Sequence, residues 1–177
     1  MLKHIRLRYD PVSDRLVLDL QMQVGGEMQS HQLHLTRRIV QTWRRDLQAM
    51  VDMSAELPAR MDPAARAAVS QAHHQALSSQ VKARTEPAPD PDAVDPGPAP
   101  RLVTRIACGR RKDDGRWVLQ FTCAEGPPLA LVLGAQTLHG LVDAVSRRVQ
   151  SAQWNLPPTA SERSAPDALA NSGSSLH

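Results

Sequence analysis

The chain is poor in aromatic side chains, with three tryptophans, one tyrosine and one phenylalanine among its 177 residues. The sequence therefore predicts an aliphatic core, and stacking on nucleic-acid bases would have few side chains to draw on. Two cysteines, Cys108 and Cys123, are too few for a disulfide-rich secreted domain and lack the C-x-x-C spacing typical of zinc sites. No apolar run approaches the length of a membrane-spanning helix, so we expect no membrane partner.

Sequence signals for catalysis are missing as well. No serine or cysteine lies in a glycine-flanked strand-to-helix turn, and Gly25-Gly26 joins two predicted strands instead of opening a phosphate-binding helix. The N-terminal segment lacks the apolar stretch and small-residue cleavage site of a secretory signal. These features predict a soluble, cytoplasmic protein that is not an enzyme and that binds no cofactor and no metal.

The histidines do not form an evident ligand set. His31 and His34 have opposite strand parity, and His73 and His74 are separated by roughly 100° on a predicted helix. His31 is expected to face inward opposite Leu20, with its ring bonded to a nearby carbonyl. A small-ligand pocket around His31 is an alternative, although the residue types there do not indicate which ligand it would bind.

Charge and composition divide the chain into segments. Residues 1–84 carry 12 Lys/Arg and 8 Asp/Glu residues, and residues 101–155 carry 8 and 4. Residues 85–100 are rich in proline and carry four acids and no base, which predicts an acidic linker. Residues 155–177 are poor in large apolar side chains and are expected to form a disordered tail. One hypothesis is that the acidic linker folds over a basic surface and masks it.

The first segment is predicted to begin with a three-stranded meander. Apolar residues alternate in two runs, from Ile5 to Tyr9 and from Leu16 to Met22, and DPVSD lies between them. Pairing Asp10 with Arg15 and Val24 with Glu27 collects the apolar residues on one face. The expected apolar pairs are Ile5 with Leu20, Leu7 with Leu18, Tyr9 with Leu16, Leu18 with Leu33, and Leu16 with Leu35.

Two helices are predicted to follow. Thr36 is a permitted N-cap, and the helix it begins places Val40, Trp43, Leu47, Met50 and Val51 on one face. Asp62-Pro63 predicts the start of a second helix over about 63–83, which is rich in alanine and has a weak apolar face. We expect this second helix to lean on a partner or to fray.

Residues 101–154 repeat the strand-strand-strand-helix plan. A two-residue turn at Asp114-Gly115 would pair Asp113 with Arg116, Cys108 with Phe121 and Ile106 with Cys123. This register places the two cysteines diagonally, roughly 7 to 8 Å apart, which predicts free buried thiols. Residues 129–133 form the third predicted strand, and a helix follows with an apolar face of Leu138, Leu141, Val142, Val145 and Val149.

The two segments align with each other at five apolar positions: Leu33 with Leu131, Leu35 with Leu133, Val40 with Leu138, Trp43 with Leu141, and Leu47 with Val145. We interpret this as an internal duplication. The predicted fold class is α+β, with two β-β-β-α units packed as an intramolecular pseudo-dimer and an extra helix after the first unit. The predicted domains are 1–84, the linker 85–100, 101–154 and the tail 155–177.

Two basic clusters are the candidate binding residues for anions or partners. On the first helix, Arg37, Arg38, Arg44 and Arg45 are spaced by close to two helical turns and are expected to form one outward stripe. Around the predicted hairpin turn lie Arg110, Arg111, Lys112 and Arg116. Guanidinium groups suit phosphates and acidic protein surfaces, although solvated basic residues also serve solubility alone.

The order of strands followed by a helix is similar in outline to that of Whirly and Pur-type proteins, which bind single-stranded nucleic acid through duplicated sheet-plus-helix units. Their units have four strands where three are predicted here, and no motif residue matches. The leading hypothesis is therefore a non-enzymatic adaptor that binds a protein partner through sheet edges or the alanine-rich helix. Binding of single-stranded DNA or RNA through the basic clusters is the alternative.

Overall fold

The computed structural model describes residues 1–58, 60–82 and 99–157. Within them the chain is α+β, as the sequence predicts, with one six-stranded sheet and three helices. The predicted linker 85–100 lies outside the described residues except for Ala99 and Pro100, and so does the predicted tail beyond residue 157. In the part of the chain that is described, no helix has both the length and the apolar character needed to cross a membrane.

The first meander consists of β1 (Leu2–Asp10), β2 (Arg15–Val24) and β3 (Glu27–Leu35). Its predicted register is confirmed from the pair Asp10 with Arg15 to the pair Val24 with Glu27. The Asp10 carboxylate fixes the first turn by accepting from the Val12 amide at 3.1 Å. Gly25 and Gly26 form the second turn at φ of 60° and 91°, which glycine adopts without strain.

The second meander consists of β4 (Arg101–Arg110), β5 (Trp117–Cys123) and β6 (Leu129–Leu133). Its predicted register is wrong by two residues, since Ile106 lies opposite Phe121 and Arg110 opposite Trp117. The connection is longer than predicted because the Arg111 amide bonds to the Arg116 carbonyl at 2.8 Å, which leaves residues 112–115 in the loop. A shift of two residues keeps strand parity, so Ile106 and Cys108 still face the core, and a bulge between Val103 and Arg105 turns Val103 inward as well.

The helices are α1 (Arg37–Ser54), α2 (Pro63–Lys82) and α3 (Ala135–Ser151). Both predicted N-caps are confirmed. Thr36 Oγ1 accepts from the Ile39 amide at 3.4 Å, and Asp62 Oδ2 accepts from the amides of Ala64 and Ala65 at 3.0 and 3.1 Å. Helix α2 packs mainly against α3 within the chain, so the partner that its weak apolar face needs is an element of the same molecule.

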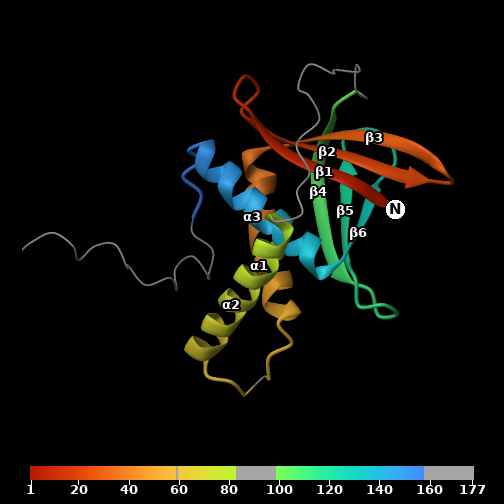
Figure 1. Cartoon of the computed structure of the whole chain (residues 1–177). Coiled ribbons are helices and arrows are strands. Elements are labelled where there is room, and N and C mark those ends of the chain that lie inside the picture. Colours follow the sequence, from red (N-terminus) through yellow and green to blue (C-terminus); the bar gives the residue numbers. More distant parts are fainter. Residues whose placement is uncertain (59, 83–98, 158–177) are drawn as a thin grey trace, which may run out of the picture.

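The two meanders meet through a short parallel pairing of β3 with β4, at Leu33 with Arg101 and at His34 with Leu102. In Figure 1 the red-to-orange meander runs across the green-to-teal one, and the three helices lie on the other side of the molecule. Helix α1 packs against β4 of the second meander, and α3 packs against β1 of the first. The rings of Trp43 and Phe121 meet edge to face at 5.9 Å, so the core is shared across the two halves.

Candidate functional site

The arginines of α1 do not form a single exposed stripe. Arg37, Arg38 and Arg45 are exposed, whereas Arg44 is buried, with a relative exposure of 8%. The predicted position of Arg44 is therefore wrong. At 100° per residue Arg44 lies only roughly 20° around the helix from Val51, so it belongs to the edge of the apolar face.

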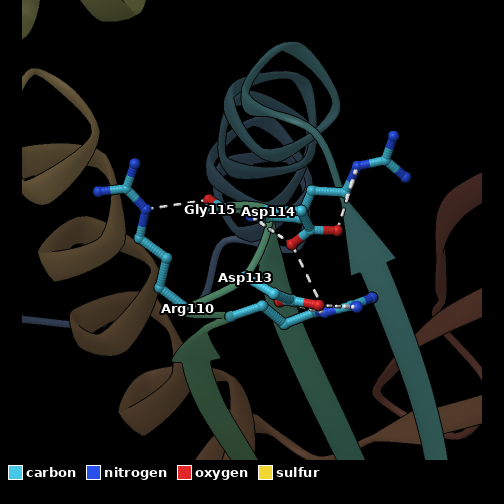
Figure 2. Close-up of polar contacts among 6 residues, drawn as sticks. Arg110, Asp113, Asp114 and Gly115 are labelled. Carbon is cyan, nitrogen blue, oxygen red and sulfur yellow. Dashed lines mark hydrogen bonds and ion pairs between the residues drawn. The ribbon is translucent and has the colours of Figure 1, made fainter.

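At the β4–β5 hairpin tip the basic residues are held by acidic neighbours. Figure 2 shows the Arg110 guanidinium turned back toward the Gly115 carbonyl, which it bonds at 2.9 Å. Arg110 also pairs with Glu56 at 2.7 Å, and Arg111 pairs with Asp113 at 2.5 Å. Arg116 approaches Asp114 at 3.7 Å. The guanidinium of Arg111 lowers the pKa of Asp113, which keeps that carboxylate ionised.

This pairing changes what the hairpin tip can bind. Asp113, Asp114 and Glu56 offset most of the charge of Arg110, Arg111, Lys112 and Arg116. Arg110 is further engaged by the Trp117 ring, with 5.4 Å between its guanidinium carbon and the ring centroid. A phosphate would have to displace these contacts, so the tip is a structured turn with weak net charge.

The aromatic side chains offer no exposed platform for bases. Trp43, Trp117, Phe121 and Trp154 are buried, and Tyr9 is half-buried. The Tyr9 ring packs edge to face on Trp154 at 5.9 Å. Stacking contributes much of the affinity of single-strand binders, so this arrangement does not favour that mode.

A polar cluster that the sequence did not reveal joins the three helices. His139 on α3 is fully buried, and its Nδ1 lies 2.8 Å from Nδ1 of His74 on α2. Its Nε2 lies 2.9 Å from the hydroxyl of Ser54 on α1. The His73 ring packs against His139 at 5.3 Å between centroids. Burial, and then the neighbouring His74 and His73, together lower the pKa of His139 to about 4.

The hydrogen-bond directions in this cluster follow from one fixed proton. The Ser54 hydroxyl has a single hydrogen, which it donates to the Val51 carbonyl at 2.6 Å. His139 Nε2 must then donate to Ser54, and the neutral His139 accepts at Nδ1 from His74. His139 therefore does not act as a base toward Ser54. The cluster has the residue types of a proton relay, but its hydrogen bond runs in the opposite direction, from the histidine to the serine.

One signal in the sequence points weakly to His139. It follows Leu138 on the apolar side of α3, and Leu138 and Leu141 are both buried. Its bonding partners lie 65 and 85 positions away along the chain, so sequence spacing alone does not connect them. Within the described ranges, no three or more His, Cys, Asp and Glu residues are placed to hold a metal ion.

His31 lies opposite Leu20 as predicted, but its buried Nε2 has no hydrogen-bond partner among the described residues, so the expected carbonyl is missing there. Burial and the nearby Arg101 lower the pKa of His31. Cys108 and Cys123 are free, and burial raises the pKa of Cys108 to about 12, which keeps it an unreactive thiol.

Strand β3 leaves part of one edge open. Its pairing with β4 is confined to Leu33 and His34, so the preceding part of its outer edge has no strand partner in the described chain. Residues 27–30 are exposed, and the Met28 side chain is 56% exposed. By contrast, the edge strand β1 has a side-chain partner, because its Leu7 carbonyl accepts from Arg148 Nε at 3.0 Å.

The chain matches no protein-family model, no curated protein sequence and no solved structure.

Proposed function

We propose that this protein is a non-enzymatic adaptor that binds a protein partner by adding a partner strand to the open edge of β3. The observation that carries the proposal is the restriction of β3–β4 pairing to Leu33 and His34. An open edge presents unpaired backbone N–H and C=O groups, which bind an extended peptide through main-chain hydrogen bonds.

The exposed Met28 side chain supplies an apolar contact beside this edge. The other surface expected from the sequence, the alanine-rich helix, is less suited to docking because α2 already lies against α3. We further propose that the two β-β-β-α halves are a duplicated pseudo-dimer. The reciprocal packing of α1 on β4 and of α3 on β1 supports this proposal.

The test is affinity capture from cells with quantitative mass spectrometry, using the wild type and a Met28→Lys/Ser30→Lys variant. Lysines along an edge strand oppose strand addition, so we expect recovery of the true partner to fall at least tenfold. Val12→Lys is the matched control, because Val12 is 95% exposed at a different turn. If every captured protein is recovered equally by all three chains, the β3 edge is not the binding site.

Binding of single-stranded nucleic acid is the second candidate. It is supported by the exposure of Arg37, Arg38 and Arg45 on one helix. Fluorescence anisotropy with labelled single-stranded DNA, duplex DNA and RNA across a salt series tests it, with an alanine variant at these three arginines alongside. Binding that weakens log-linearly with salt, with a reduced slope in the variant, would favour this candidate over the adaptor.

A further inference from the structure

The described contacts of α2 with α1 and α3 include several buried polar groups. Ser70 and Ser78 of α2 are buried, and Ser70 donates to Asp52 of α1 at 2.9 Å. His74 bonds to the fully buried His139, which bonds in turn to Ser54. Where apolar burial is small, hydrogen bonds and protonation states contribute a larger share of the docking free energy.

In the neutral His74–His139 pair, only one of the two Nδ1 atoms can carry the hydrogen of the bond. Neutral His139 has its hydrogen on Nε2, directed at Ser54, and receives the His74 hydrogen at Nδ1. A second proton on His139 would have to sit on Nδ1, so His74, whose Nδ1 lies 2.8 Å away, would have to move its own hydrogen to Nε2. A positive charge would then lie on a fully buried ring beside two further imidazoles.

No described carboxylate is bonded to His139 to compensate that charge. Helix α2 presents His73 and His74, α1 presents the neutral Ser54, and the contact of β1 with α3 is at Leu7 and Arg148, more than two turns further along the helix. Two carboxylates on α1 and α3 are bonded to other groups: Asp52 accepts from Ser70, and Asp143, one turn beyond His139, accepts from Arg147 at 2.6 Å.

We propose that α2 is an acid-released arm, docked on α3 near neutral pH through the His74–His139–Ser54 chain and released when the surroundings become acidic. Release would uncover the buried His139 face of α3 and the end of α1. The acid release of α2 does not involve the open edge of β3, so this proposal does not depend on the proposed adaptor function.

The direction of the pH dependence follows from the difference in the pKa of His139 between the docked and the undocked state. The docked state holds the pKa of His139 at about 4, below the ordinary value of 6.5. The undocked state therefore binds the proton more strongly, and docking weakens as pH falls from 6.5 toward 4. With these two pKa values for His139, the equilibrium constant for the docking of α2 falls roughly 30-fold between pH 7.5 and pH 5.0.

Amide hydrogen exchange of the full chain, corrected for intrinsic rates at each pH, tests the proposal. Peptides covering residues 63–80 should lose protection at least tenfold between pH 7.5 and pH 5.0. Peptides covering residues 40–51 of α1 should keep theirs, since this local opening leaves the core intact. Constant protection in 63–80, or an equal loss in both helices, would overturn the proposal.

Two variants separate protonation from simple structural damage. His139→Gln keeps one donor and one acceptor but cannot be protonated, so its change in protection should stay below twofold. His74→Asn, at a half-buried position, lets the amide turn its oxygen toward a protonated His139, so the acid response should weaken even if the first variant misfolds. His4→Gln, at an exposed histidine on β1, should respond as the wild type does. A full acid response in both cluster variants would refute the role of His139.

Discussion

Helices α1 and α3 end with the same backbone geometry but are anchored to the opposite meander in different ways. Each closes on an alanine, Ala55 or Ala152, and the next residue has positive φ, 48° at Glu56 and 52° at Gln153. Beyond α1 the anchor is the exposed ion pair between Glu56 and Arg110. Beyond α3 the anchor is the buried Trp154.

The anchor of α3 is the stronger by physical reasoning. Trp154 is 5% exposed, its Nε1 donates to Asp14 in the β1–β2 turn at 2.6 Å, and its ring packs on Tyr9. A buried tryptophan with a charged acceptor stabilises far more than a surface ion pair, which contributes about 0 to 1 kcal/mol. Of these two anchors, the one from α3 to the first meander therefore contributes more to holding the halves together.

Separating the halves should have the largest effect. Fragments 1–84 and 101–157 would each lose contacts that cross between the two halves, including that of Trp43 on α1 with Phe121 on β5. Units this small bury only a marginal core, so neither fragment alone should unfold cooperatively. Circular dichroism during thermal unfolding measures this, and mixing the fragments should restore a transition. Two independently stable fragments would disprove the shared core.

Replacing Trp154 with alanine should have the second-largest effect on stability. The loss of a buried ring and of a hydrogen bond to a carboxylate predicts destabilisation by about 3 to 5 kcal/mol. Urea unfolding measures the change. Trp154→Phe is the control, because it keeps a smaller ring against Tyr9 and removes the donor, and it should cost about 1 to 2 kcal/mol. Equal losses in both variants would assign the whole anchor to the hydrogen bond.

Acid should loosen the same anchor through Asp14. Hydrogen bonds from Trp154 and then from Tyr9 lower the pKa of Asp14 below its ordinary 3.8. A lowered folded-state pKa contributes stability above pH 3.8 that is lost as pH falls below it. In Asp14→Asn the free energy of unfolding should therefore depend less on pH in that acid range, and in Trp154→Phe the pH dependence should be partly reduced. Urea midpoints measured at several pH values give the comparison. If Asp14→Asn loses stability in acid as the wild type does, Asp14 does not contribute to the anchor.

How far the sequence predicts this fold depends on how local each signal is. The first meander was predicted correctly because both turns carry residues that fix their own geometry, Asp10 in one and Gly25-Gly26 in the other. At Asp114-Gly115 the same rule failed. There Asp114 accepts from the Arg116 amide at 3.1 Å and Arg111 pairs with Asp113, so side-chain bonds favour a four-residue loop.

The candidate site was less predictable because its contacts join distant elements. The burial of Arg44 reflects packing around α1 that a helical stripe alone does not show. The ion pair of Arg110 with Glu56 and the bonds of His139 with His74 and Ser54 join elements on different parts of the chain. Periodicity identifies helix faces, whereas such pairs depend on how the helices are placed in space.

The smallest predicted effect comes from the residues of positive φ at the two helix ends. Glycine adopts this conformation without the strain that a side chain causes, so Gln153→Gly should raise the free energy of unfolding by about 0.5 to 1 kcal/mol. Glu56→Gly should gain less, because it also removes the ion pair with Arg110. The difference between the two variants, measured by urea unfolding, isolates that ion pair, and the addition of salt should narrow it. If Glu56→Gly stabilises as much as Gln153→Gly at low salt, the surface anchor of α1 contributes nothing and Trp154 is the only one of the two anchors that stabilises the fold.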